Sequence, residues 1–146
     1  MRHDTRLPRV LHALLHLEGL DHPVTSRALA EMLGTNGAVV RRIMGGLRDV
    51  GVVASAKGHG GGWSLARPLS EISLLMVYEA LGSPPLFAIG HDGGSPSCLL
   101  ARAANEATAE ALKVGRAAFE KRLSETFVSD LAMARATQMG RGGRRR

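Results

Sequence analysis

Residues 35–67 carry the side chains whose types and spacing point to a definite chemistry, the binding of a polyanion. The segment holds two adjacent arginines, Arg41 and Arg42, and then Lys57 directly before the glycine-rich run 58–62. An arginine binds a guanine edge or a phosphate through two hydrogen bonds at once, and glycines let a backbone approach a groove closely. These residues therefore indicate contact with a nucleic acid.

The arginine pair falls in a segment with helical periodicity. Asn36 is an N-cap residue at its start, and Gly51 ends it. The apolar residues recur three or four positions apart and predict one buried stripe, made of Val40, Ile43, Leu47 and Val50. The arginine pair is left on the exposed side. Gly45 and Gly46 each cost a helix about 1 kcal/mol relative to alanine, which indicates that the backbone passes close to another helix or to DNA.

Two short helices precede this segment and a hairpin follows it. Helical spacing of apolar residues predicts a first helix over residues 6–18, and Thr25 and Gly34 mark the two ends of a second. Residues 52–57 and 62–66 are strand-like, and the glycines between them supply the turn. Two helices, the arginine-bearing helix and a hairpin predict a winged helix-turn-helix.

A fourth helix completes the expected winged domain, residues 1–82. Ser73 caps this helix and Gly82 ends it. We expect Trp63 to lie in the core under the hairpin. The fold class is therefore mainly α with a small β-hairpin wing.

The C-terminal half reads as a loop followed by one long helix. Residues 83–97 form a Pro/Gly-rich loop that is longer than most connections in a compact domain, and residues 98–123 are helical. Loops of this length are often functional or mobile. Small apolar residues repeat along the helix at coiled-coil spacing and form a seam of Leu100, Ala104, Ala107, Ala111, Val114 and Ala118. Packing of this seam on its own domain is possible, but we favour a dimerisation helix. Residues 127–132 are expected to fold back on this helix, which gives a dimerisation segment over residues 98–136, and residues 137–146 form a disordered basic tail.

Charge and cysteine usage limit the function classes. The chain of 146 residues has a formal charge of +6, and residues 1–67 carry nine Lys/Arg against five Asp/Glu, whereas residues 68–139 carry six against eight. Only the first half is therefore expected to face a polyanion. The single cysteine, together with the lack of a signal peptide or membrane span, predicts a cytoplasmic protein with no membrane partner.

With these segments in place, the chain resembles the IscR/NsrR/CymR-type winged-helix repressors, the Rrf-two family, over nearly its whole length. The resemblance rests on four segments: Ala28-Leu-Ala-Glu31, Leu47-Arg-Asp-Val-Gly-Val-Val53, Lys57-Gly-His-Gly-Gly-Gly-Trp-Ser-Leu-Ala-Arg-Pro68 and Ile72-Ser-Leu-Leu-Met-Val-Tyr-Glu-Ala-Leu-Gly82. It implies a homodimeric, sequence-specific DNA-binding transcriptional regulator, usually a repressor, with its sensor at the loop before the dimerisation helix. Residues 35–42 are similar to the branch that generally lacks an iron–sulfur cluster.

A winged helix places the N-terminus of its recognition helix in the major groove of double-stranded DNA. We therefore expect Arg41 to contact bases and Arg42 to contact phosphate, although both could be solvated helix arginines without a role. The other candidate DNA contacts are Thr35, Asn36, Gly37 and Ala38 at the helix start, and Lys57, His59 and Gly60 on the wing. Arg2, Arg6 and Arg9 are candidates for further phosphate contacts.

The sequence defines the signal that would control the regulator less clearly than it defines the candidate DNA contacts. Only Cys98 remains where cluster-binding relatives carry three cysteines, so an iron–sulfur cluster is not expected, nor is a metal site built from His12, His91, Asp92 and Cys98. His12 matches a ligand position of some relatives, but Pro8 replaces its acidic partner. Cys98 is either a redox sensor at a helix N-terminus or a small buried apolar residue. An unknown small-molecule effector could bind near the Phe87 loop.

Two other function classes are alternatives to a transcriptional regulator. The first is a winged-helix protein-interaction module that binds nucleic acid without specificity through its basic tail. The second is an enzyme, which is not expected because the sequence shows no catalytic Ser/His/Asp, paired-carboxylate or phosphate-loop constellation.

Overall fold

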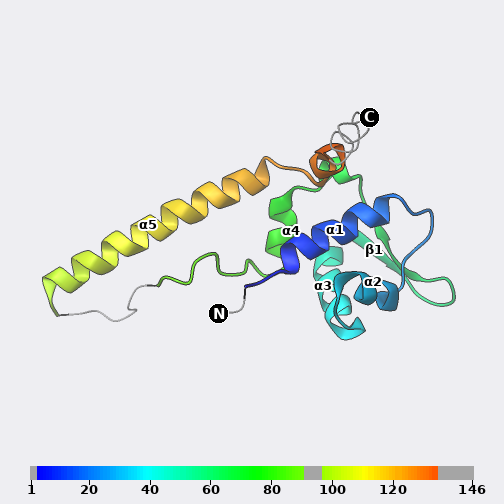
Figure 1. Ribbon diagram of the computed structural model, residues 1–146, viewed down its shortest axis with the longest axis horizontal. Helices are drawn as coiled ribbons and strands as arrows, with labels where there is room; N and C mark the ends of the chain where they lie inside the picture. The colour runs from blue at the N-terminus through cyan, green and yellow to red at the C-terminus, as the bar shows by residue number, and fades with distance from the viewer. Residues whose placement is uncertain (1–2, 91–96, 135–146) are drawn as a thin grey trace, which may run out of the picture.

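The chain folds into a helical domain with a hairpin, from which one long helix extends (Figure 1). The computed structural model describes residues 3–90 and 97–134. Its elements in chain order are α1 (Arg6–Glu18), α2 (Ser26–Leu33), α3 (Gly37–Asp49), β1 (Val53–Ala56), β2 (Gly62–Leu65), the 3-10 turn η1 (Leu69–Glu71), α4 (Leu74–Ala80) and α5 (Leu99–Ser124). The predicted class, mainly α with a hairpin wing, is confirmed.

Local side-chain chemistry fixes where three of the helices begin. The side-chain oxygens of Thr25, Asn36 and Ser73 each accept a hydrogen bond from the backbone N–H three residues later, at 3.2, 3.1 and 3.2 Å. Each bond satisfies one of the free donors of a helix N-terminus. Gly34, at φ 63°, ends α2 in the left-handed conformation that favours glycine. All three caps agree with the sequence-based prediction.

The core lies between α1, α2, α3 and α4, and it corrects one prediction for α3. Val40, Ile43 and Leu47 are buried as expected, but Val50 is 43% exposed. Val50 is the C-cap residue that follows the last turn, so it no longer continues the buried stripe. Met44, which is fully buried, takes the remaining place on that stripe.

The hairpin is joined to the start of α2 by a third stretch of extended chain. Strands β1 and β2 pair antiparallel, and the backbone of Val24 exchanges hydrogen bonds of 2.9 and 2.8 Å with Trp63 on β2. Trp63 is buried as predicted, and its indole Nε1 donates to the Ser26 hydroxyl at 3.0 Å. A side chain at Gly62 would collide with the Val24 backbone, so glycine is required there. The hairpin is therefore fixed against the helices at its base.

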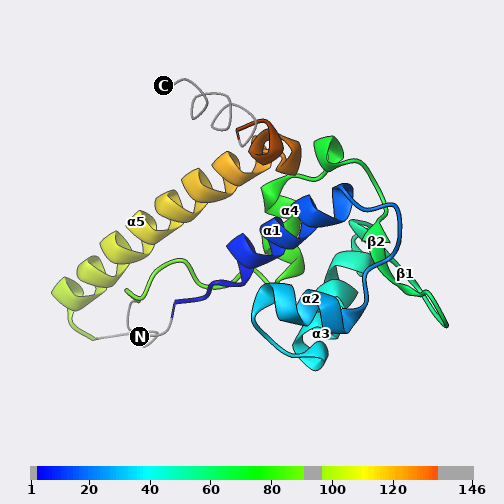
Figure 2. The ribbon, with the colours of Figure 1, turned by 45° about the vertical axis from the view of Figure 1, so that its right-hand side comes forward.

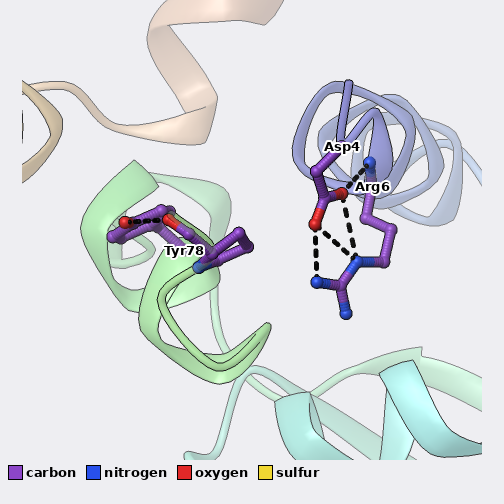
Figure 3. A network of polar contacts seen from close by, with 4 residues as sticks. Asp4, Arg6 and Tyr78 are labelled. Atoms are coloured by element: carbon purple, nitrogen blue, oxygen red, sulfur yellow. Dashed lines mark hydrogen bonds and ion pairs between the residues drawn. The ribbon is translucent and has the colours of Figure 1, made fainter. Parts of the chain in front are cut away.

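Helix α5 attaches to the domain through its C-terminal half. The rings of Tyr78 in α4 and Phe119 in α5 pack edge to face with their centroids 5.3 Å apart. The Tyr78 hydroxyl donates to the Pro84 carbonyl oxygen at 2.6 Å, which holds the chain after α4 (Figure 3). The Phe87 ring fills the space beside Gly115, where a Cβ would lie 2.9 Å from its Cζ atom.

The segment after α5 returns to the winged domain, contrary to the prediction that it folds back on the long helix. Phe127 forms an antiparallel bridge with Ser73, and the Val128 N–H donates to the Ile72 carbonyl oxygen at 2.9 Å. Val128 is fully buried in the same core as α1 and α4. This end of α5 is therefore part of the winged domain, while its N-terminal part extends away from it (Figures 1 and 2).

Candidate DNA-recognition surface

The N-terminus of α3 is presented at the surface by a tight turn after α2. The Thr35 N–H donates to the Ala30 carbonyl oxygen at 2.9 Å, which closes this turn. Asn36 and Ala38 are exposed, whereas Thr35 and Gly37 are half-buried. The first turn of α3 thus offers free backbone N–H groups and small side chains, an arrangement that suits an anion or a groove edge.

The two arginines of α3 lie in different surroundings. The guanidinium of Arg41 folds back over the start of the helix. Its Nη1 atom lies so near Gly37 that a Cβ added there would be 3.3 Å away. Arg42 instead lines a groove of about 350 Å³ together with Arg6 and the end of α4. Both side chains are exposed. The two side chains are therefore separated in space, and their roles in DNA binding stay a prediction.

The wing tip, residues 57–61, is a cationic turn built on glycine. Lys57, His59 and Gly60 are exposed, and the predicted candidates of the wing therefore lie on one loop. Gly58 and Gly60 have φ values of 88° and 76°, a region that other residues adopt only with strain. The loop can hold this shape only with glycines at those positions.

Arg48 was not among the predicted DNA contacts, although the structure places it between α3 and the hairpin. Its Nη1 lies 3.5 Å from the Ser55 hydroxyl oxygen, and its guanidinium lies 6.0 Å from the centre of the Trp63 ring. Arg48 follows Arg41 by seven residues, two helical turns on the same face, and this spacing was the available signal. Arg67 acts at the base of the hairpin by donating from Nε to the Gly51 carbonyl oxygen at 2.8 Å.

The arginines of α1 are engaged within the protein. The Asp4 carboxylate accepts hydrogen bonds from the Arg6 guanidinium, the shortest at 2.6 Å from Nη2 (Figure 3). The guanidinium of Arg6 holds the pKa of the Asp4 carboxyl below its usual value. Arg9 donates from Nη1 to the Leu33 carbonyl oxygen at 3.3 Å, where it supports the end of α2. Arg2 lies outside the described residues.

Cys98 lies far along the chain from this surface, at the N-cap of α5. Its side chain is exposed in the protomer. The backbone N–H groups of Ala101 and Leu100 lower the pKa of the Cys98 thiol, although no cap hydrogen bond forms. His91 and Asp92 lie outside the described residues.

The chain matches the Rrf2 family, described as an iron-dependent transcriptional regulator, over residues 3–134. This match includes the capped α3, the wing and the whole of α5. The chain belongs to the Rrf2 family. It is also 30% identical over 129 residues to YwnA of Bacillus subtilis (strain 168), assigned as a helix-turn-helix-type transcriptional regulator, and the match covers 88% of this chain and 95% of YwnA.

Solved structures confirm the Rrf2 fold. A protein of Lactobacillus plantarum assigned as a transcriptional regulator has a TM-score of 0.74 and 22% identity, with 87% of each chain covered. The oxidised form of CymR from Staphylococcus aureus has a TM-score of 0.65 and 22% identity, covering 90% of this chain and 96% of CymR. IscR of T. potens has a TM-score of 0.64 and 19% identity, covering 92% and 88%.

Membership of the Rrf2 family establishes the coarse function, a DNA-binding transcriptional regulator. Among the residues that the structure describes, no set of donors matches the iron in the family description. The chain has one cysteine, and among residues 3–90 and 97–134 no three His, Cys, Asp or Glu side chains gather to hold a metal ion. No helix in those same ranges is long and apolar enough to cross a membrane.

Proposed function

We propose that the protein is a homodimeric, sequence-specific transcriptional repressor of the cytoplasm that works without an iron–sulfur cluster. The observation that carries the DNA-binding part is the position of Arg41 at the exposed start of α3, in the same domain as a cationic glycine wing. A recognition helix of this kind reads bases with its first turns, while cations on the wing contact the backbone or the minor groove. In this proposal the start of α3 borders the edge of the DNA major groove through Thr35, Asn36, Gly37 and Ala38.

The experiment is a protection footprint on the DNA upstream of the protein's own gene at moderate salt. We expect a protected site that Arg41→Ala weakens in a sequence-dependent manner and that Arg42→Ala weakens for all sequences. Lys113→Ala on α5, which removes an exposed cation far from α3, is the matched control and should leave the site intact. A footprint that is absent, or that neither arginine variant changes, contradicts the proposal.

Removal of residues 140–146 separates this function from an interaction module that binds nucleic acid only through its basic tail. A specific regulator keeps its protected site without the tail, because base readout resides in α3. The tail-only alternative predicts loss of nearly all DNA binding. Transcription in vitro from the same DNA tests repression, since a repressor lowers the transcript yield when it occupies its site.

The homodimer is supported by the unpartnered seam of α5. All six predicted seam residues are exposed in the protomer. The two largest of them, Leu100 and Val114, have exposed fractions of 81% and 60%. Small residues between them allow two helix backbones to approach closely. Ala107→Arg places a charge in the middle of the seam. Sedimentation should then show a shift from dimer to monomer, whereas the same change at Thr108, off the seam, should leave the dimer intact.

The signal is proposed to be oxidative and to act through Cys98. Its support is the exposure of the thiol and the lowered pKa, which together favour a reactive thiolate. The footprint should weaken or strengthen after peroxide treatment, and Cys98→Ser should abolish that response without changing binding by the reduced protein. If the Ser variant responds like the wild type, the signal is a different one. A small-molecule effector would then be sought in the groove of about 320 Å³ between the Phe87 loop and α5.

A further inference from the structure

Two histidines on α1 form a pair that the proposed function does not use. His12 and His16 are one helical turn apart, and both side chains are exposed in the protomer. Their Nε2 atoms lie 2.9 Å from each other, and the rings meet nearly edge to face with centroids 4.6 Å apart. Two ring nitrogens therefore converge on one point of the protein surface.

The pair has little structural value of its own. Neither ring is buried, so the pair adds almost no apolar contact to the core, and a hydrogen bond between two exposed neutral groups contributes little to stability. Within residues 3–90 and 97–134, the Nε2 atoms of His12 and His16 have each other as hydrogen-bond partners.

A metal ion fits the distance between the nitrogens. Imidazole nitrogens bind transition ions at about 2.0–2.1 Å, so two of them in adjacent corners of a square plane are about 2.9 Å apart. In a tetrahedral site the same two ligands are separated by about 3.3–3.4 Å. The observed 2.9 Å matches the planar arrangement, which nitrogen ligands give Cu(II).

The position of the pair along α1 also favours a cation. His16 lies in the last turn of α1, near the negative end of the helix dipole. The helix dipole stabilises a positive ion at this end, whereas it would destabilise a positive ion bound by the same pair at a helix N-terminus.

We propose that His12 and His16 form a binding site for one Cu(II) ion, held by the two Nε2 atoms with water in the remaining positions. Each neutral imidazole supplies the electron pair of Nε2 and keeps its single proton on Nδ1. The ring whose Nε2 donates in the hydrogen bond therefore loses that proton to solvent and takes one up at Nδ1 when the ion binds, so the ligands release no net proton. This set shares only His12 with the group of four considered from the sequence, and it needs no cysteine. The site is independent of the proposed DNA binding.

The test is a Cu(II) titration of the untagged full-length protein, followed by electron paramagnetic resonance. All proteins carry His3→Gln, because an imidazole close to an amino terminus can bind Cu(II) together with the terminal amine. We expect one equivalent of bound Cu(II) per protomer, with a spectrum that shows two nitrogen ligands. His12→Gln and His16→Gln should each reduce the affinity by more than about tenfold, the loss that even an outer-shell ligand partner can cause.

Matched controls separate this site from other exposed imidazoles and from the thiol. His22→Gln, His59→Gln and Cys98→Ser should keep the wild-type titration. Cu(II) should also raise the unfolding temperature of the parent protein and of these controls, but not of the His12 or His16 variants, since the two nitrogens converge only on a folded helix. Circular dichroism confirms that the variants fold.

Three results would overturn the assignment: Cu(II) binding that survives loss of either histidine, binding that disappears with Cys98→Ser, or a spectrum with one nitrogen in the parent protein. The footprint of His12→Gln without copper tests the independence of the two functions. It should equal that of the wild type, so failure of the copper site leaves the DNA-binding proposal unaffected.

Discussion

Gly46 in α3 lies against Ala80 at the end of α4, so close that a Cβ added at Gly46 would be 2.8 Å from the Ala80 carbonyl oxygen. The neighbouring Gly45 has nothing within 4 Å of the same position. The sequence left two explanations open for this glycine pair: the α3 backbone passes close to another helix, or it passes close to DNA. The contact with α4 accounts for Gly46, whereas Gly45 remains open on the surface.

The two glycines should respond in opposite directions to replacement by alanine. Gly46→Ala should lower the free energy of unfolding by about 1–3 kcal/mol, because α3 or α4 must shift to admit the methyl group. Gly45→Ala should raise it by up to about 1 kcal/mol, since the methyl group meets nothing and helix propensity improves. Urea unfolding followed by circular dichroism measures both. Equal effects of the two changes would contradict the packing described for α3 and α4.

Asn36 allows stability and DNA binding to be separated at a single position. Asn36→Ala removes the cap of α3 and should cost about 1 kcal/mol in urea unfolding. Asn36→Asp keeps a capping oxygen, so the domain should stay as stable as the wild type, but it places a negative charge where DNA phosphates are expected. The Asp variant should therefore weaken the footprint without loss of stability. A stable Asp variant with unchanged DNA binding would place the DNA elsewhere.

The ion pair between Asp4 and Arg6 should limit the electrostatic attraction to DNA. Asp4→Asn releases the Arg6 guanidinium, which lines the same groove as Arg42. We expect stronger DNA binding at low salt and a salt dependence steeper by about one unit in the logarithmic slope. The double variant Asp4→Asn/Arg6→Ala should keep the wild-type slope, because the ion pair and its replacement both carry no net charge. An unchanged slope for Asp4→Asn would show that the DNA does not reach this groove.

The ion pair between Asp4 and Arg6 also predicts a small effect of pH on the free energy of unfolding. The folded state lowers the pKa of the Asp4 carboxyl, chiefly through the hydrogen bond from Arg6. Its stabilising contribution is therefore present above the pKa of the unfolded chain and is lost as the pH falls through the lowered folded pKa. Because the pair is largely exposed, solvent screening keeps the contribution small. Wild type and Asp4→Asn should differ least in stability at the acid end.

Tyr78 should control how firmly the chain after α4 is held. Tyr78→Phe keeps the ring contact with Phe119 but removes the hydroxyl that donates to Pro84, and it should cost about 1 kcal/mol. Hydrogen exchange should accelerate in residues 83–90 and change little in the C-terminal half of α5. Phe119→Ala, which breaks the ring contact instead, should accelerate exchange in that half of α5. Identical exchange patterns would contradict separate roles for the hydroxyl and the ring.

The helix starts, the hairpin and most of the buried stripe of α3 could be predicted from the amino-acid sequence. Caps such as Thr25 and Asn36 act on N–H groups three residues away, and helical periodicity is a property of neighbouring turns, so both can be seen without tertiary information. The candidate DNA contacts also came from the sequence, because Arg41 and the wing glycines lie on local elements. Arg48 was missed, although its spacing from Arg41 was visible.

Contacts between segments that are distant along the chain could not be predicted in this way. Val50 becomes exposed because α3 ends just before it, and Val128 enters the core because residues 72–74 offer free backbone groups to pair with. The approach of Gly46 to Ala80 depends on how α3 and α4 cross. These outcomes follow from the shape and the unpaired hydrogen-bonding groups of surfaces that exist only after the helices have packed.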